Sequence, residues 1–141
     1  MRIFLDANIL FSAAKSNGAV RGLLHDLHAN GHVLVADEYV ATEARRNIAA
    51  KATGDALPYL QALLSQIEVT AVTQSTNATP IADWLPPKDR PVLLSAIACQ
   101  CDALVTGDRT HFGAGYGKVF QGVTLYSPAQ LAMHLWSEVG R

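Results

Sequence analysis

Four acidic residues, spread over most of the chain, have positions that suit metal-dependent chemistry: Asp6, Glu43, Asp89 and Asp108. Carboxylates that gather in one place repel one another and lose hydration, so they persist mainly where cations neutralise them. A ligand set made only of oxygens suits Mg²⁺ or Mn²⁺ better than Zn²⁺, which prefers His and Cys. Two such ions about 4 Å apart can activate a water molecule and stabilise the leaving oxygen of a phosphodiester. We therefore predict hydrolysis of a nucleic-acid backbone at a site built from these four residues.

Two of the acids follow apolar runs that predict buried strands. Asp6 directly follows the run at residues 2–5, and Asp108 comes shortly after the run at 103–106. Such continuous runs are typical of a parallel sheet covered on both faces. Ligands of an open parallel sheet bind beyond the carboxyl ends of the strands, near the switch in strand order. If the two strands are neighbours, both carboxylates face the same crevice.

The other two acids belong to predicted helices. Asp37 follows the apolar run at residues 32–36 as an N-cap, and Glu43 lies far enough into the same helix to lean over the crevice. Asp89 stands at the amino end of the helix that leads to the strand at 103–106. That helix returns the chain to the start of the strand, so its amino end lies on the side of the strand's carboxyl end. All four acids are therefore expected on one rim.

The elements that must position these residues alternate along the chain. We predict strands at residues 2–5, 32–36, 68–72, 103–106 and 123–125, and helices through 20–27, 38–52, 57–67 and 90–100. The segment Ser127-Pro128-Ala129-Gln130 has the pattern of a capping box and opens a last helix. The polar stretch at 73–88 predicts a long loop, with one helical turn near 81–84. This order indicates a single α/β domain over residues 1–141, with a mostly parallel sheet between two layers of helices.

Three blocks of the sequence resemble the PIN-domain family. They are Leu5-Asp6-Ala7-Asn8-Ile9-Leu10, Ala41-Thr42-Glu43-Ala44, and Asp89 together with Val105-Thr106-Gly107-Asp108-Arg109-Thr110-His111-Phe112. The resemblance covers nearly the whole chain, and its last block is the most specific. It implies a five-stranded parallel sheet in the order 3-2-1-4-5, Mg²⁺ or Mn²⁺ as cofactor and endoribonuclease activity. It also implies a VapC-like toxin that a small antitoxin protein holds inactive. The family's acidic positions fall on the same four acids, and its polar helper positions fall on Asn8 and Thr106.

Basic residues accompany the acids in the sequence and are candidates for phosphate contacts: Arg45, Arg46, Lys88, Arg90 and Arg109. Such contacts supply affinity for a nucleic acid without reading its sequence. Each of these side chains has a plain alternative as a solvated surface charge. The net charge of −1 on its own argues against a nucleic-acid binder, since such proteins are often basic. It misleads if several acids gather in one metal site whose cations cancel them, so composition does not decide the partner.

Each candidate acid also has a structural interpretation. Asp6 and Asp108 can serve as turn residues, Asp89 as an N-cap, and Glu43 as an ordinary solvated helix residue. Asp102 precedes the strand at 103–106, about 20 Å of extended chain from Asp108, and is predicted to be structural.

Histidine and cysteine do not form a convincing zinc site in the sequence. His25 and His28 share a helix edge, but Gly31 ends that helix before His32. Cys99 and Cys101 are too close along the chain to bridge on a helix, so we expect free thiols.

Composition narrows the class of protein. Half of the 141 residues are apolar and 16% are charged, as in a globular domain. Neither a membrane span nor a leader segment is evident, so we expect a cytoplasmic protein. The apolar face at residues 20–27 and the helix with Trp136 are candidates for a homodimer interface, although core burial accounts for most of that surface equally well.

Two other functions remain open at this stage. A phosphatase of the haloacid dehalogenase type also carries an acid after its first strand, but it would need a second aspartate where this chain has Asn8. A binding module with the same fold and weak catalysis would also retain the elements, although the intact acids argue against it. A dinucleotide-binding domain is set aside because no glycine-rich turn follows the first strand.

Overall fold

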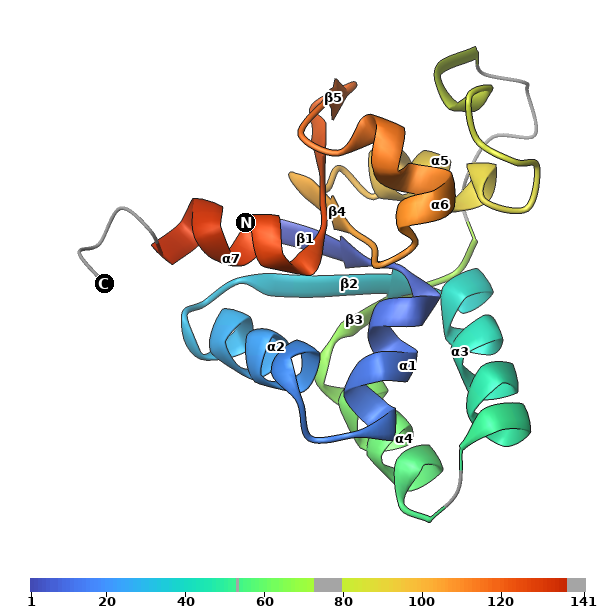
Figure 1. Cartoon of the computed structure of the whole chain (residues 1–141), viewed down its shortest axis with the longest axis vertical. Helices are drawn as coiled ribbons and strands as arrows, with labels where there is room; N and C mark the ends of the chain where they lie inside the picture. Colours follow the sequence, from blue (N-terminus) through green and yellow to red (C-terminus); the bar gives the residue numbers. More distant parts are fainter. Residues whose placement is uncertain (53, 73–79, 137–141) are drawn as a thin grey trace.

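A six-stranded sheet runs through the middle of the molecule (Figure 1). The computed structural model describes residues 1–52, 54–72 and 80–136. The strands lie in the order β3-β2-β1-β4-β6-β5. They are β1 (Arg2–Leu5), β2 (Val33–Asp37), β3 (Glu68–Thr70), β4 (Ala103–Val105), β5 (Val119–Phe120) and β6 (Val123–Tyr126). All neighbouring pairs are parallel except β5 and β6, which are antiparallel.

The predicted fold class is confirmed, with one added strand. The five predicted strands correspond to β1, β2, β3, β4 and β6, and these follow the predicted order. The sixth strand, β5, has only two residues and forms a hairpin with β6 at the edge of the sheet. It escapes prediction because so short a segment has no readable periodicity. Gln121 and Gly122 between the two strands have φ values of 47° and 86°, as a tight hairpin turn requires.

Seven helices surround the sheet in the part of the chain that the structure describes. They are α1 (Ala7–Lys15), α2 (Ala19–Ala29), α3 (Glu38–Lys51), α4 (Ala56–Gln66), α5 (Arg90–Ala98), α6 (Arg109–Phe112) and α7 (Pro128–Trp136), with short 3-10 helices at Pro80–Ala82 and Gly113–Gly115. Helices α1 to α4 pack against one another beside β2 and β3. Helices α5 and α6 lie beside the other half of the sheet (Figure 1). Only residues 80–88 of the predicted loop at 73–88, which include the helical turn, are among the described residues.

Helix α1 was not predicted, and it matters for the site. It begins directly after β1 because the Asp6 side chain accepts a hydrogen bond of 2.7 Å from the backbone N–H of Ala7. Its residues Ile9, Leu10 and Ala13 are buried against the helices α2, α3 and α4. The apolar part of α1 is short and follows β1 without a turn signal, so the periodicity of the sequence does not separate the helix from the strand.

The central strands supply the core. Phe4, Leu5, Val35 and Leu104 have no exposed surface. Burying such side chains contributes roughly 1.5–3 kcal/mol each, which fixes the register of β1 between β2 and β4. Met1 packs outside this core with 38% of its surface exposed. The sheet therefore offers a rigid base for the strand ends.

The predicted capping box at the last helix is confirmed. The Ser127 hydroxyl accepts a hydrogen bond from the Gln130 N–H at 3.2 Å, and the Gln130 side chain accepts one from the Ser127 N–H at 3.3 Å. Among the described residues, no helix is both long and apolar enough to cross a membrane.

Candidate functional site

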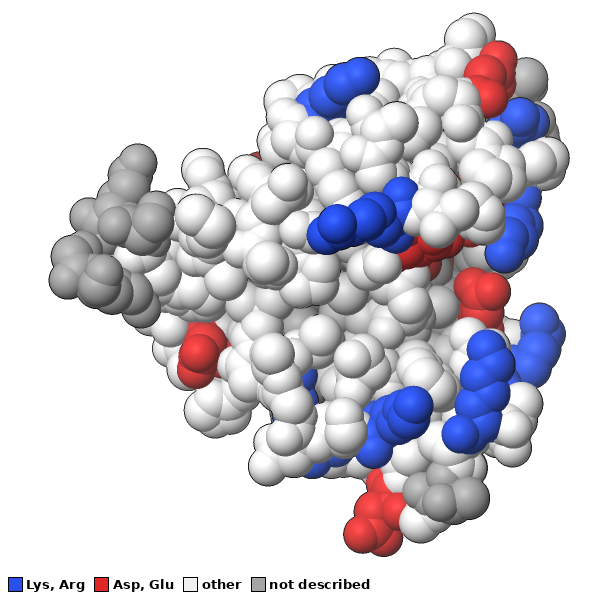
Figure 2. Space-filling view, viewed as in Figure 1, with Lys and Arg blue, Asp and Glu red and all other residues white. Residues whose placement is uncertain are grey.

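The strands that carry Asp6 and Asp108 are neighbours in the sheet. Leu5 of β1 pairs with Val105 of β4, and the Asp6 N–H donates to the Val105 carbonyl at 3.1 Å. Both strands therefore end at the same edge, and α1, α3 and α6 begin there (Figure 1). Figure 2 shows acidic side chains at this edge, set in a notch between the two halves of the molecule, with basic side chains on either side.

The Asp6 carboxylate is buried and held by three hydrogen bonds. Its Oδ1 accepts from the Ala7 N–H, and its Oδ2 accepts from the Thr106 hydroxyl at 2.8 Å and from the Asn8 amide at 3.1 Å. Only 5% of the residue is exposed. This burial, with a smaller contribution from the charges of Glu43 and Asp89, raises the pKa of Asp6 to about 6 against the hydrogen bonds from Thr106 and Ala7, which lower it. The carboxylate is therefore fixed in place and poorly stabilised as an anion.

Asn8 and Thr106 tie the start of α1 to the loop after β4. The Asn8 side chain accepts from the Gly107 N–H at 2.8 Å and donates to the Thr106 hydroxyl at 3.2 Å. The Thr106 hydroxyl also accepts from the Asp108 N–H at 3.2 Å. The two predicted helper residues thus connect the backbones that carry Asp6 and Asp108.

Glu43 approaches the site from α3. Burial raises the pKa values of Asp6 and Tyr39, and the charge of Glu43 adds to both, so its carboxylate lies near these two residues. It also lines an open hollow of about 300 Å³ together with Glu38, Tyr39, Thr42, Arg46 and Val72. The Tyr39 hydroxyl donates to the Lys88 carbonyl at 2.7 Å, so α3 is linked to the loop before Asp89.

Asp89 occupies the N-cap position of α5 but makes no capping hydrogen bond. Its Oδ2 instead lies 2.9 Å from the Nδ1 of His111, which lies 2.9 Å from the Oδ2 of Asp108 as well. Burial raises the pKa of Asp89, and Asp108 adds to this, whereas Lys88 and His111 act in the opposite direction. An interpretation of Asp89 as a helix cap alone therefore does not fit its side chain.

The three side chains Asp89, Asp108 and His111 form a group whose ligand atoms all lie within 4.8 Å of one another. Oδ2 of Asp89 and Nδ1 of His111 are closed off from water, and despite their short separation they are not aligned as a hydrogen bond. Asp6 lies near this group, because the charge of Asp89, like that of Glu43, acts on its carboxylate.

His111 is the site residue that the sequence reasoning missed. It lies in the first turn of α6, where its backbone N–H donates to Oδ1 of Asp108 at 3.1 Å. The spacing Asp-x-x-His is the signal in the sequence that could have identified His111. The backbone N–H of the third residue after an N-cap bonds to the side chain of the cap, which brings that residue close to it.

The five candidate phosphate contacts differ in their surroundings. Arg46 lines the hollow beside Glu43, and Lys88 lies close enough to Asp89 to lower its pKa. Arg45 lies 3.7 Å from Glu38 in an exposed ion pair. Arg109 follows Asp108 at the start of α6, and burial raises the pKa of Tyr116 although the charge of Arg109 opposes this.

Arg90 has a structural role that competes with phosphate binding. Its guanidinium donates to the carbonyl of Leu85 at 2.9 Å and to that of Asp83 at 3.3 Å. Asp102 likewise has a structural role, away from the site. Its carboxylate accepts a hydrogen bond of 2.8 Å from the backbone N–H of Arg2. That contact is at the opposite end of β1 from Asp6.

The parallel sheet, the switch in strand order between β1 and β4 and the acids at that switch define an α/β domain of the class that binds ligands at the switch point. The family model of the PIN domain matches residues 2–110. The chain therefore belongs to the PIN-domain family, as its motifs predicted. His111 lies just beyond the matched range.

Solved structures with the same fold are similar over most of the chain. VapBC2 from Rickettsia felis, bound to a DNA fragment from its promoter, has a TM-score of 0.63 and 17% identity over 90% of this chain and 98% of that one. FitAcB from Neisseria gonorrhoeae gives 0.56 and 17% over 90% and 98%. VapC20 of Mycobacterium tuberculosis, described as a toxin that cleaves the sarcin-ricin loop, gives 0.57 and 14% over 83% and 98%. No curated protein matches the sequence at a significant level. At these identities the likeness establishes the fold.

Proposed function

We propose that this protein is a cytoplasmic, divalent-metal-dependent endoribonuclease and the toxin of a type II toxin–antitoxin pair. The observation that carries the proposal is the gathering of Asp6, Glu43, Asp89 and Asp108 at one edge of the sheet, from four separate parts of the chain. Four carboxylates at one place are costly unless a cation neutralises them, so the arrangement favours a metal-dependent reaction.

The residues present fit Mg²⁺ or Mn²⁺. The donors are carboxylate oxygens, which these ions prefer. The buried Oδ2 of Asp89 has no hydrogen-bond partner, and a bound cation would coordinate it instead. We assign metal binding to the four acids, with Glu43 either completing the ligand set or orienting the attacking water. When bound, the metal would activate that water and offset charge on the phosphate. Hydrolysis joins the water oxygen to phosphorus and breaks the bond to the leaving oxygen, which takes up a proton.

The chain's own residues prepare the site for this reaction. Thr106 and Asn8 donate hydrogen bonds to Oδ2 of Asp6 and hold the carboxylate in one orientation. Arg46 and Lys88 border the acids and are our candidates to hold the phosphates of an RNA strand on either side of the scissile bond, with Arg109 on the far side of Asp108.

A cleavage assay with matched variants tests the activity. Single-stranded RNA and DNA of the same sequence are incubated with Mn²⁺ or Mg²⁺ and purified protein. Asp108→Asn should lower RNA cleavage at least about 100-fold, because even the loss of an outer-shell partner costs about 10–100-fold. Asp83→Asn makes the same chemical change at an exposed residue and should cleave like wild type. Equal cleavage by wild type and Asp108→Asn would sink the assignment, and cleavage of DNA alone would remove the RNA substrate.

An antitoxin partner is supported by the similar structures named above. Two of those structures are VapBC2 and FitAcB. An extended antitoxin segment with an Arg could enter the notch and pair with the carboxylates. Induced expression of the chain in a bacterial host should stop growth, and Asp108→Asn should not. Normal growth with wild type, together with no small gene beside its own, would contradict the toxin proposal.

A homodimer is a separate proposal, and little exposed apolar surface supports it. Leu23, Leu24 and Leu27 of α2 are buried in the core and leave only the edge of that helix for a partner. On α7, Met133 is 66% exposed. Sedimentation velocity of wild type and Met133→Lys would detect a dimer that uses this surface.

A further inference from the structure

The imidazole of His111 stands where the third ligand of a metal ion would stand. Its Nδ1 is 2.9 Å from Oδ2 of Asp89 and 2.9 Å from Oδ2 of Asp108. Adjacent ligands of an octahedral ion, each about 2.1 Å from the metal, are about 3 Å apart. The two spacings from Nδ1 to the carboxylate oxygens therefore match those of adjacent octahedral ligands, and all three atoms lie within 4.8 Å of one another.

The environment of these atoms supports coordination over simple hydrogen bonding. Nδ1 of His111 and Oδ2 of Asp89 are shielded from water, and neither is aligned for a hydrogen bond with the other. Buried polar atoms without aligned partners are rare, since each costs about 1–3 kcal/mol. A cation beside Asp108 would satisfy both the Asp89 oxygen and the ring nitrogen.

The local backbone holds the three atoms in this arrangement. Asp108 uses Oδ1 to cap the N–H of His111, which leaves Oδ2 directed toward the ring. Asp89 makes no capping bond in α5 and turns its carboxylate to the same point. The His111 side chain keeps 32% of its surface exposed, so the ring lies at the border of the site although its Nδ1 faces inward.

We propose that His111 is a direct ligand, through Nδ1, of the metal ion held by Asp89 and Asp108, and that it makes the site prefer a transition-metal ion such as Mn²⁺ over Mg²⁺. This inference rests on the proposed metal-dependent function. Mg²⁺ keeps to oxygen ligands and water, whereas imidazole nitrogen suits transition metals better. The all-oxygen set expected from the sequence does not distinguish Mn²⁺ from Mg²⁺. A nitrogen ligand distinguishes the two ions, because it favours Mn²⁺.

Metal binding by the whole chain without RNA tests the proposal. Mn²⁺ bound to wild type should show electron spin-echo modulation from a coordinated ¹⁴N, and His111→Asn and His111→Phe should lose it. His111→Asn puts an amide oxygen near the place of Nδ1. It should hold Mg²⁺ within about threefold of wild type but lower the preference for Mn²⁺ at least about tenfold. His111→Phe should weaken Mn²⁺ binding at least about tenfold.

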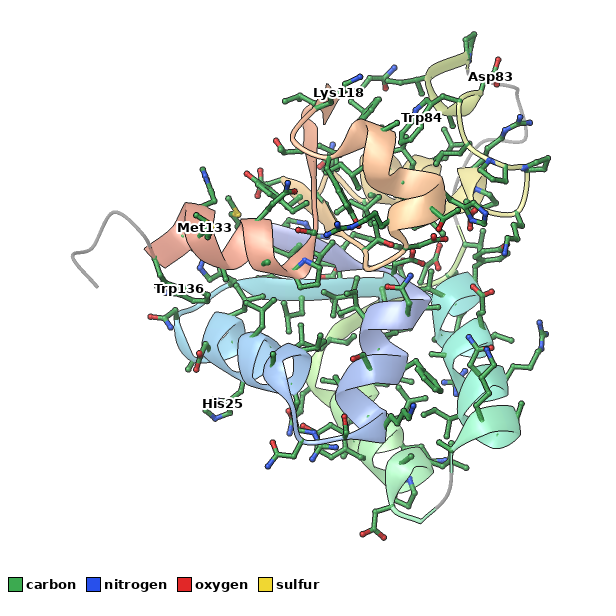
Figure 3. All side chains as sticks on the ribbon, viewed as in Figure 1. His25, Asp83, Trp84, Lys118, Met133 and Trp136 are labelled. Carbon is green, nitrogen blue, oxygen red and sulfur yellow. The ribbon has the colours of Figure 1, made fainter. Side chains whose placement is uncertain are left out.

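Two further variants separate the possible outcomes. His25→Asn, on the exposed edge of α2 (Figure 3), should leave the ¹⁴N signal and the preference unchanged. Asp108→Asn should weaken both metals. Mn²⁺ bound to wild type without ¹⁴N modulation, or an unchanged preference in both His111 variants, would overturn the role of His111 and leave the metal-dependent function standing. If wild type binds neither ion, both proposals fail.

Discussion

At the scale of single residues, the site combines an anchored carboxylate with an unfavourable place for its charge. Asp6 receives hydrogen bonds from Ala7, Asn8 and Thr106, yet its pKa is raised to about 6 because burial outweighs them. A bound cation would remove this penalty. The metal-free protein therefore carries the cost of the site in its own stability.

This cost should appear as a pH dependence of stability. Between the unfolded value of 3.8 and about 6, the folded protein keeps a proton on Asp6 that the unfolded chain has released. The free energy of unfolding of the metal-free protein should therefore fall as pH rises from about 4 through about 6, by roughly 3 kcal/mol. Urea unfolding in the presence of a chelator measures it.

The variant Asp6→Asn isolates the contribution of that carboxyl. It cannot bind the proton, so its stability should change less over the same pH range. Asp89, whose pKa is also raised, titrates in both proteins and largely cancels in the difference. Asp83→Asn should retain the wild-type profile. Parallel profiles for wild type and Asp6→Asn would show that Asp6 titrates normally in the folded state.

At the scale of elements, the site depends on contacts that join helices and loops far apart in the sequence. One of them is the hydrogen bond from Tyr39 on α3 to the Lys88 carbonyl, directly before Asp89. It holds the loop with Asp89 against the helix with Glu43. A second is the stacking of Trp84 on Phe120 at 5.2 Å, which fastens the loop before α5 to the hairpin at the sheet edge (Figure 3).

Tyr39→Phe should loosen Asp89 without disturbing the core. The change removes the hydroxyl and keeps the ring, so stability should fall by only about 1 kcal/mol. Mn²⁺ affinity, measured by calorimetry, should fall about tenfold, because the loop that carries a ligand loses its support. Tyr59→Phe, on α4, removes a hydroxyl elsewhere and serves as the control. Equal Mn²⁺ affinity in Tyr39→Phe and wild type would contradict a positioning role.

Gly115→Ala should disturb the aromatic contact. A Cβ at this position would lie 2.5 Å from the Trp84 ring and 2.8 Å from the Leu125 side chain. Such overpacking typically costs about 1–3 kcal/mol, and thermal unfolding should show a lower Tm. Gly22→Ala is the matched control, because its Cβ meets nothing within 4 Å in the middle of α2. That change should stabilise the protein by about 0.5–1 kcal/mol. Equal effects of the two changes would contradict the close packing at Gly115.

At the scale of the whole molecule, the distribution of charge matters more than its sum. The net charge is only −1, but acids fill the notch and bases border it (Figure 2). With cations bound among the acids, this surface would become favourable for the phosphates of RNA. The charge balance of the sequence alone cannot predict such a local reversal.

The salt dependence of RNA binding should identify the bases that take part. In an Asp108→Asn background, which prevents cleavage, log K for single-stranded RNA should fall linearly with log salt concentration. Arg46→Ala should reduce the magnitude of that slope by about 1, since it removes one phosphate contact. Lys51→Ala removes the same charge at the far end of α3 and should leave the slope unchanged. Identical slopes for the two variants would exclude Arg46 from the interface.

The sequence by itself determined the central strands and the place of Asp6 and Asp108 at strand ends, and its resemblance to the PIN-domain family implied the order of the strands. Continuous apolar runs identify buried strands, and parallel strands put their carboxyl ends on one edge. The same resemblance pointed to Asn8 and Thr106 as helper residues, and the pairing of β1 with β4 brings both to Asp6. These inferences depend on local pattern and simple topology, which is why they survive without coordinates.

The tertiary structure decided which way side chains point and which distant groups meet. Asp89 has the sequence of a helix cap, yet its carboxylate turns to His111, because a position in the chain does not fix a rotamer. Arg90 stands beside the acids in the sequence but donates to carbonyls of the preceding loop. His111 enters the site because the first turn of α6 brings its ring back over Asp108 and toward Asp89 from another element. Contacts of this kind depend on packing between segments far apart in the chain, and no local pattern encodes them.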